Sequence, residues 1–189
     1  MRPGWDPRAE RSACGIGFVA DASGRESRHV VELGIEALRR LEHRGAAAGD
    51  GVTGDGAGML VPIPRDLLGD ELGLSDDERR TMGVAMVFAR GDVERRLPAL
   101  LRDACAPEGV ETLELRKVPV EPGALGPAAA ASAPTILQAV IGPAPGRAKE
   151  PAVAHRIRRR LERDIAAEGL DAYVVSLGFR TVTYKALVR

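Results

Sequence analysis

Cys14 is a residue whose type and position could support nucleophilic catalysis. It lies between a polar leader, residues 1–13, and a stretch with strand-like character at 14–21. Removal of the leader would give Cys14 a free α-amino group, whose pKa of about 7.7–8.0 suits a base at neutral pH. The thiol and the amine of one residue would then form a nucleophile–base pair. A lone cysteine at the start of a strand is more often a small buried hydrophobic residue, and both interpretations stay open here.

A second segment with chemical potential is the glycine-rich run H-R-G-A-A-A-G-D-G-V-T-G-D-G-A-G at 43–58. Six of its sixteen residues are glycine, which predicts an irregular loop with positive φ angles or close backbone approaches. A cation at a helix end is commonly explained by the helix dipole, and this accounts for His43. It accounts less well for Arg44, which leads directly into the loop. No Lys-Ser/Thr pair follows T-G-D-G-A-G at 53–58, so this is not a Walker-type phosphate loop.

Two further motifs suggest chemistry but fit a structural interpretation better. G-I-G-F-V-A at 15–20 matches a loose dinucleotide-binding pattern, yet a polar leader precedes it where that pattern needs a strand. The run H-R-I-R-R-R-L-E-R-D at 155–164 is basic and could suggest nucleic acid. Ile157, Leu161 and Ile165 recur at helical spacing, so we predict that the arginines are the solvated face of a packed helix.

A helix is predicted between the two candidate segments. Ser27 can cap its start, because a serine hydroxyl accepts a hydrogen bond from a backbone N–H of the first turn. Val31, Ile35 and Leu38 recur at helical spacing, and the charged residues fall on other positions. This helix would lead the chain from the strand that begins at Cys14 to the glycine-rich loop.

The remaining predicted elements alternate along the chain and indicate a mixed fold. The last two strands, 173–177 and 181–187, flank Gly178 and are expected to pair as a hairpin. The order of strands and helices indicates an α+β or α/β architecture with a layered sheet. The other predicted elements are strands at 59–63, 84–89, 113–120 and 135–141, helices at 91–105 and 150–167, short helix and turn at 65–80, and a loop with a short helix at 121–134.

Length and composition set limits on the function. The chain has 189 residues, enough for one domain or a little more with a substantial core. Lys and Arg together number 27, as do Asp and Glu, and this balance disfavours a nucleic-acid or anionic-membrane surface. Apolar runs are too short for a membrane span, and the leader lacks an apolar signal core, which predicts a cytoplasmic protein. Two cysteines are too few for a metal or disulfide framework.

Three blocks of the sequence, by their order and spacing, resemble the amino-terminal segment of glutamate synthase large subunits. The blocks are C-G-I-G-F-V-A at 14–20, L-E-H-R-G-A at 41–46 and T-G-D-G-A-G-M-L at 53–60. Two later stretches agree as well, V-P-V-E-P-G-A-L-G at 118–126 and Y-V-V-S-L-G-F-R-T-V-T-Y-K-A-L at 173–187. The resemblance therefore runs from Cys14 to the last residue, and the three early blocks together are specific.

The resemblance implies a class II glutamine amidotransferase domain. Its fold would be that of N-terminal nucleophile hydrolases, an α+β architecture layered as an αββα sandwich, incomplete in this chain. Residues 1–13 would be a leader that the family removes, and 14–189 would be part of the amidotransferase domain. Cys14 would attack the carboxamide of glutamine, releasing ammonia and leaving a thioester that water cleaves. Arg44 would shape the glutamine pocket. The loop residues that match the family and would support the site are Gly45, Asp50, Thr53, Gly54, Asp55 and Gly56.

The resemblance also implies cofactors and partners beyond these residues. In the family, ammonia passes to a distant domain with FMN and an iron–sulfur cluster, where 2-oxoglutarate becomes glutamate. The present residues are expected to hold no cofactor and no metal. The expected partners are glutamine and either the remainder of a glutamate synthase large subunit or a complementing chain, with no nucleic acid and no membrane.

The chain contains no Asn, which departs from the family pattern. The resemblance implies an Asn-Gly pair in the oxyanion hole, a second arginine for the substrate carboxylate and an Asp for its amine. Loss of one oxyanion donor typically costs about 10²–10³ in rate. We therefore expect a fragment that holds the nucleophile half of the site and lacks the binding half. A non-catalytic module of the same fold and a different amidotransferase with the same nucleophile are the alternatives.

Overall fold

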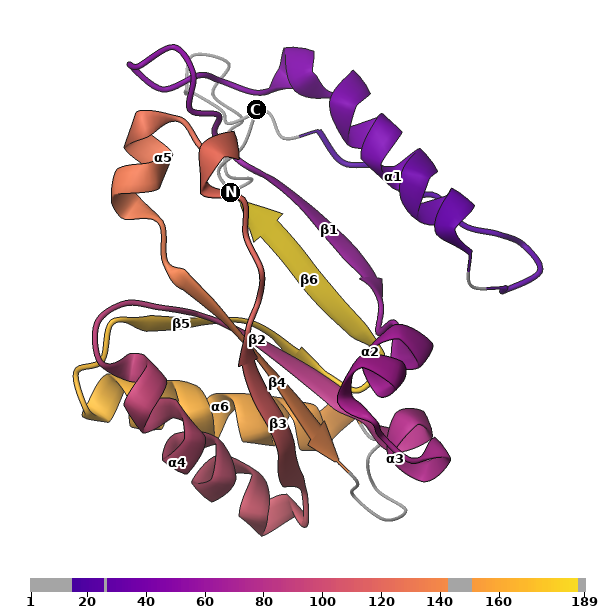
Figure 1. The fold of residues 1–189 in the computed structure, drawn as a ribbon, viewed down its shortest axis with the longest axis vertical. Helices are drawn as coiled ribbons and strands as arrows, with labels where there is room; N and C mark the ends of the chain where they lie inside the picture. The colour runs from indigo at the N-terminus through magenta and orange to yellow at the C-terminus, as the bar shows by residue number, and fades with distance from the viewer. Residues whose placement is uncertain (1–14, 26, 143–150, 187–189) are drawn as a thin grey trace, which may run out of the picture. The chain divides into compact units, whose positions relative to one another are not determined.

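The described residues form two compact units. The first contains the described residues up to Ala57 together with Ala124–Ala129 and Ala186. The second contains the described residues of Gly58–Gly123 and Ala130–Lys185. The computed structural model describes residues 15–25, 27–142 and 151–186 (Figure 1).

A four-stranded antiparallel sheet in the order β3-β4-β2-β5 is the centre of the second unit. β2 (Gly83–Ala89) pairs with β4 (Thr135–Gly142) on one side and with β5 (Ala172–Gly178) on the other. β3 (Glu111–Lys117) pairs with the other side of β4. Because β2 is buried along almost its whole length, its sequence is a continuous apolar run and does not alternate. The predicted strands at 84–89, 113–120 and 135–141 are confirmed, with boundaries displaced by up to three residues.

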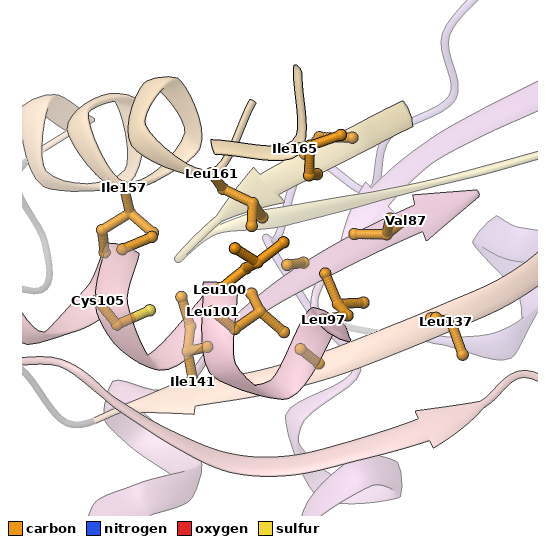
Figure 2. Packing of buried hydrophobic residues seen from close by; sticks show 14 of the residues in the cluster. Val87, Leu97, Leu100, Leu101, Cys105, Leu137, Ile141, Ile157, Leu161 and Ile165 are labelled. Carbon is orange, nitrogen blue, oxygen red and sulfur yellow. The ribbon is translucent and has the colours of Figure 1, made fainter. Parts of the chain in front are cut away.

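Two helices cover one face of this sheet (Figure 1). They are α4 (Val93–Cys105) and α6 (Pro151–Ala167), which confirm the helices predicted at 91–105 and 150–167. Ile157, Leu161 and Ile165 of α6 are buried, so the basic run is the outer face of a packed helix, as predicted. Figure 2 shows these side chains in the cluster between the helices and the sheet. The labelled α4 residues of the same cluster are Leu97, Leu100, Leu101 and Cys105.

A second layer of strands covers the opposite face of the sheet. β1 (Ala57–Pro62) and β6 (Thr181–Ala186) form a two-stranded sheet, and their arrows point in opposite directions in Figure 1. Met86 of β2 lies in one apolar cluster with Val182 of β6, whereas the next residue, Val87, lies in the cluster beneath α4 and α6. Because successive side chains of a strand point to opposite faces, the layers of the second unit run helix, sheet, sheet.

The predicted hairpin of 173–177 and 181–187 is wrong. The two strands form, but β5 pairs with β2 and β6 pairs with β1. The connection between them is held at the start of β2, where a Cβ added to Gly83 would lie 2.6 Å from Cδ1 of Phe179. Nη2 of Arg65 also donates a hydrogen bond to the carbonyl of Phe179 at 2.6 Å. The chain therefore leaves one sheet at Phe179 and enters the other.

Short helices occupy the two regions where short helices were predicted. Residues 65–80 contain two of them, and residues 121–134 contain a 3₁₀ turn and one α-helix. All of these helices are short, and they connect the strands of the sheets. They are α2 (Arg65–Leu72), α3 (Asp76–Thr81), η3 (Pro122–Ala124) and α5 (Pro127–Ser132).

The helix predicted after Ser27 is present in the first unit as α1 (Arg28–Arg40), with the Ser27 side chain accepting a hydrogen bond from Val30 N at 3.3 Å. The strand predicted at 14–21 is not present in its described part, residues 15–21. Ile16 and Phe18, whose alternation suggested the strand, are each 95% exposed. A strand needs a hydrogen-bonded neighbour, and within the described ranges no strand pairs with this segment.

The architecture is α+β, because every strand pairing in the four-stranded sheet is antiparallel. An α/β fold would place parallel strands around crossover helices. In the part of the chain that the structure describes, no helix is both long enough and apolar enough to cross a bilayer.

Candidate functional site

The sequence-predicted nucleophile, Cys14, lies outside the described residues. Its neighbour Gly15 is described and approaches the end of α1. A Cβ added to Gly15 would lie 3.0 Å from Cδ2 of Leu41, which directly follows that helix. The backbone at Gly15 is therefore close to the point where α1 ends and the segment with Arg44 begins.

A single 3₁₀ turn, η1 (Glu42–Arg44), carries the predicted binding residue Arg44. Its backbone is fixed, because Arg44 N donates to Leu41 O at 2.8 Å and Gly45 N donates to Glu42 O at 3.0 Å. Nδ1 of His43 lies 2.9 Å from the carbonyl oxygen of Arg40, which fits the helix-end interpretation of His43. The Arg44 side chain is exposed and forms no hydrogen bond or ion pair with any residue that the structure describes.

The glycine loop, residues 45–56, folds as a small antiparallel hairpin. Ala47 and Gly54 face each other across an isolated bridge. Ala48 N donates to Thr53 O at 2.8 Å on one side of this bridge, and Asp55 N donates to Ala46 O at 3.1 Å on the other. These bonds fix two arms, and Arg44 directly precedes the first of them.

Asp50 lies at the tip of the glycine loop and its carboxylate accepts four hydrogen bonds. Oδ1 accepts from Val52 N at 3.0 Å and from Thr53 N at 2.8 Å. Oδ2 accepts from the Thr53 hydroxyl at 2.6 Å and from Ala128 N at 3.0 Å. These donors, first of all the Thr53 hydroxyl, hold the pKa of Asp50 far below its usual range. Asp50 is therefore an anion at any physiological pH.

Thr53 joins the loop to the first turn of α5. Its hydroxyl oxygen accepts a hydrogen bond from Ala129 N at 3.3 Å, and the residue is only 5% exposed. The backbone of Gly126 packs closely against Thr53, because a Cβ added to Gly126 would lie 2.7 Å from Thr53 N. Asp50 and Thr53 thus satisfy N–H groups at the start of α5 that the helix itself cannot satisfy.

The other predicted loop residues also have definite positions. A Cβ added to Gly45 would lie 3.1 Å from Oδ1 of Asp55 and 3.3 Å from Glu42 O, so a larger residue would push the Asp55 carboxylate away. Gly56 has φ 115°, a conformation that side chains disfavour. Gly54 is buried beneath the bridge to Ala47.

All six predicted loop residues lie in the first unit together with Arg44. Sequence reasoning missed Gly126, Ala128 and Ala129, which complete the surroundings of Asp50 and Thr53. The stretch at 118–126 includes Gly126 but ends before Ala128 and Ala129, and nothing in the local pattern connects it with the loop.

The second cysteine, Cys105, is not a candidate nucleophile. Its side chain is fully buried, and burial raises the pKa of its thiol to about 11. The reactive thiolate is therefore scarce at neutral pH. Among the described residues, no group of three or more His, Cys, Asp or Glu side chains is arranged to hold a metal ion.

Arg44 is a cation that can bind a carboxylate, and hydrogen bonds fix its backbone. A guanidinium presents a planar fork of donors that matches a carboxylate. Arg44 is exposed, follows α1 directly and precedes a loop that is bonded at both ends, so its backbone position is defined. Such a residue can bind a small acid or an amino acid through its carboxylate.

Comparison with protein families gives a match over almost the whole chain. The family model described as "Glutamine amidotransferases class-II" matches residues 14–189. The match starts at Cys14 and includes Arg44 and the glycine loop.

Three of the most similar curated proteins are glutamate synthases. The chain is 36% identical over 193 residues to the glutamate synthase [NADPH] large chain of Bacillus subtilis, which covers 96% of the chain. It is 33% identical over 191 residues to the corresponding large chain of Azospirillum brasilense, with 97% of the chain covered. It is 36% identical over 191 residues to ferredoxin-dependent glutamate synthase 2 of Synechocystis, with 95% covered. The chain spans only 12–13% of the length of these relatives.

Proposed function

Because the chain belongs to the class II glutamine amidotransferases, we propose that it is the glutamine-hydrolysing domain of a glutamate synthase. The observation that carries the proposal is the family match that begins at Cys14 and includes the glycine loop. The similarity to glutamate synthases over 95–97% of the chain favours them over other amidotransferases. The acceptor 2-oxoglutarate, the FMN and the iron–sulfur cluster belong, in this proposal, to the remainder of such an enzyme or to a complementing chain.

The proposed reaction starts from a Cys14 whose α-amino group is free after loss of residues 1–13. That amine takes the thiol proton, and the sulfur adds to the carboxamide carbon of glutamine. The tetrahedral adduct then collapses, the carbon–nitrogen bond breaks, and the proton returns to the leaving group, which departs as ammonia. Water cleaves the resulting thioester, which gives glutamate and restores the thiol.

Arg44 is the proposed recognition residue. Its exposed guanidinium is proposed to shape the glutamine pocket and to offer N–H donors to the substrate, whereas the α-carboxylate of glutamine is left to the second arginine that the resemblance implies. The glycine loop supports Arg44 through the backbone bonds of its two arms. Gly45, Gly54, Asp55 and Gly56 are proposed as the residues that give this loop its shape, with Asp50 and Thr53 at its tip.

The fold proposal is the αββα sandwich of N-terminal nucleophile hydrolases. The helix–sheet–sheet layering of the second unit supports it by accounting for three of the four layers. Residues 1–13 are proposed as a removable leader and 14–189 as part of the domain. A cytoplasmic location is part of the proposal, and the free thiol of Cys105 is consistent with a reducing compartment.

The direct test is labelling of Cys14 by a diazoketone analogue of glutamine. The chain is prepared with Met directly before Cys14, so that removal of this Met exposes the amine, and the product is analysed by intact and peptide mass spectrometry. We expect one adduct on Cys14, competition by glutamine, and none on the buried Cys105. Cys14→Ser serves as the unlabelled control, and Arg44→Lys should require a higher reagent concentration for half-maximal labelling.

Two outcomes would contradict the proposal. A correctly processed chain whose Cys14 stays unlabelled, both alone and together with the remainder of the large subunit, would exclude glutamine-directed nucleophilic chemistry. Labelling that glutamine does not reduce would show a reactive thiol without a glutamine site. A chain that retains residues 1–13 provides the matching control, because its Cys14 nitrogen is a peptide nitrogen and cannot act as a base.

A further inference from the structure

The hydrogen bonds of Asp50 exceed what a local turn requires. Two of its four bonds, from Val52 N and Thr53 N, close a turn within the glycine loop. A third comes from Ala128 N, 78 residues further along the chain. A turn of this kind forms without any distant donor. The bond to Ala128 therefore serves to hold the loop against another segment, Ala124–Ala129, which belongs to the same unit.

Thr53 makes the same connection by a second path. Its hydroxyl donates to Asp50 and accepts from Ala129 N, so one oxygen links the loop tip to the start of α5. A hydroxyl can fill both roles, whereas a methyl group of the same size can fill neither. Thr53 is only 5% exposed, and its bond with Ala129 N is buried, whereas its bond with the exposed Asp50 is partly buried.

Gly126 lets the two segments approach closely enough for these bonds. A Cβ at this position would lie 2.7 Å from Thr53 N and 2.9 Å from Thr53 Cα. Both are backbone atoms of the loop, which cannot rotate away as the end of a flexible side chain can. Any side chain here would push Ala124–Ala129 and the loop apart.

The connection extends to Arg44 through the arms of the loop. Thr53 O accepts from Ala48 N, and Asp55 N donates to Ala46 O, so a displaced Thr53 displaces the first arm as well. Gly45, which begins this arm, leaves room for the carboxylate of Asp55, because a Cβ added to Gly45 would lie 3.1 Å from Asp55 Oδ1. Arg44 is the next residue towards α1.

We propose that Asp50 and Thr53 are positioning residues for glutamine binding, which fix the glycine loop on Ala124–Ala129 and thereby hold Arg44 in place. The inference rests on the proposed function. It assigns to the segment around Gly126 a role in substrate affinity although no residue of that segment needs to touch glutamine.

The experiment compares labelling of Cys14 at many concentrations of the diazoketone analogue for wild type, Thr53→Val and Thr53→Ser. We expect Thr53→Val to raise the half-saturating concentration about tenfold, the equivalent of one or two lost hydrogen bonds. The labelling rate at saturation should change less than about twofold, because the Cys14 chemistry is untouched. Thr53→Ser, which keeps the hydroxyl, should restore the wild-type concentration.

The matched control is Asp21→Asn. The Asp21 carboxylate also accepts bonds from a neighbouring residue, Ser23 N and Oγ at 2.7 and 2.6 Å, but has no long-range partner among the described residues. This variant should label like wild type. Trypsin cleavage after Arg44 provides a second measurement, and it should accelerate about tenfold in Thr53→Val and Gly126→Ala at an unchanged melting temperature.

The outcomes separate the two proposals. A wild type that stays unlabelled, both alone and together with the remainder of the large subunit, would overturn the proposed function and this inference with it. A labelled wild type together with an unchanged Thr53→Val would overturn this inference alone. Thr53→Val could instead lower both the labelling rate at saturation and the melting temperature, with Thr53→Ser showing the same losses. In that case the role of Thr53 is structural and the inference is wrong.

Discussion

Glu108 has the most buried carboxylate among the ion pairs of the described residues, with 6% of its side chain exposed. Arg156 holds it with Nε at 3.0 Å and Nη2 at 2.6 Å, and Nη1 of Arg160 lies at 2.7 Å. Glu108 follows α4, and both arginines are on α6, so this cluster ties together the two helices that cover the sheet. Two of the arginines in the basic run therefore have a packing role in addition to their solvated position.

Replacement of Glu108 by Gln should destabilise the chain measurably. The amide keeps the shape but removes the negative charge that Arg156 and Arg160 bind here, and bonds to charged groups contribute about 1.5–3 kcal/mol each. Because Arg156 and Arg160 are 41% and 28% exposed, water replaces part of the loss, and we expect about 1–3 kcal/mol in urea unfolding. Glu32→Gln removes an exposed pair with Arg28 and should cost less than about 0.5 kcal/mol. Equal effects of the two substitutions would contradict this role of Glu108.

The same carboxylate predicts how stability depends on pH. Its hydrogen bonds with Arg156 and Arg160 lower the pKa of Glu108 from 4.5 to about 2 in the folded chain. A folded pKa below the unfolded one means that the stabilisation is complete above pH 4.5 and is lost as pH falls towards 2. The difference in unfolding free energy between wild type and Glu108→Gln should therefore be constant near neutrality and shrink below pH 4.5. A difference that persists unchanged at pH 3 would contradict the assignment.

At the scale of elements, the corner between β5 and β6 decides which strands pair. Gly83, at the start of β2, leaves room for the ring of Phe179. Arg65 Nη1 donates to Arg79 O at 2.7 Å and Met82 O at 2.9 Å, and Nη2 donates to Phe179 O. One guanidinium thus binds three carbonyls where α3 ends, where β2 begins and where the chain changes sheets.

Gly83→Val should strain this corner and destabilise the chain by about 1–3 kcal/mol, the usual cost of overpacking. The added Cβ would lie 2.6 Å from Cδ1 of Phe179 and 2.9 Å from Gly178 O. Phe179→Ala in the same chain removes the ring but leaves the carbonyl, so the double variant should lose less stability than the sum of the single ones. If the stability losses of the two single variants add up in the double variant in thermal unfolding, the ring of Phe179 is not what excludes a side chain at position 83.

Elements with strong local patterns were predictable, whereas their pairing was not. The stripe of Ile157, Leu161 and Ile165 specified α6, and the apolar run of β2 specified a buried strand. The hairpin failed because the partner of β5 depends on a corner built by Arg65 and Gly83, far away in the sequence. The predicted first strand failed because its alternation has no neighbouring strand in the described chain.

The candidate site was predictable to the same extent, because the sequence indicated its loop but not the distant contacts of that loop. Glycine spacing and the family resemblance pointed to the loop that follows Arg44, and the described loop residues do lie together in the first unit. The contacts of Asp50 and Thr53 with Ala128 and Ala129 were not predictable, because 76 or more residues separate the partners. Such contacts are set by tertiary packing and leave no periodic signal.

At the scale of the molecule, the two units differ in how much they bury. Both apolar clusters belong to the second unit. In the described part of the first unit the buried residues are Thr53, Gly54, Gly126 and Ala129, and α1 buries none of its residues. The apolar residues Val31 and Ile35 of α1 remain 42% and 39% exposed. Tertiary packing, the main source of helix stability in proteins, therefore contributes little to α1.

Hydrogen exchange should reveal this difference directly. The 13-residue helix α1 is held by its Ser27 cap and by exposed pairs such as Arg40–Glu36, which contribute only tenths of a kcal/mol. Its amides should exchange through local opening, at least about a hundredfold faster than those of β2 and β4, whose exchange requires global unfolding. Low denaturant concentrations should accelerate β2 and β4 and leave α1 nearly unchanged, because local opening exposes little surface. Glu108→Gln supplies the control, since it should accelerate the sheet and not α1. Protection of α1 equal to that of the sheet, with the same response to denaturant, would show that the units unfold as one.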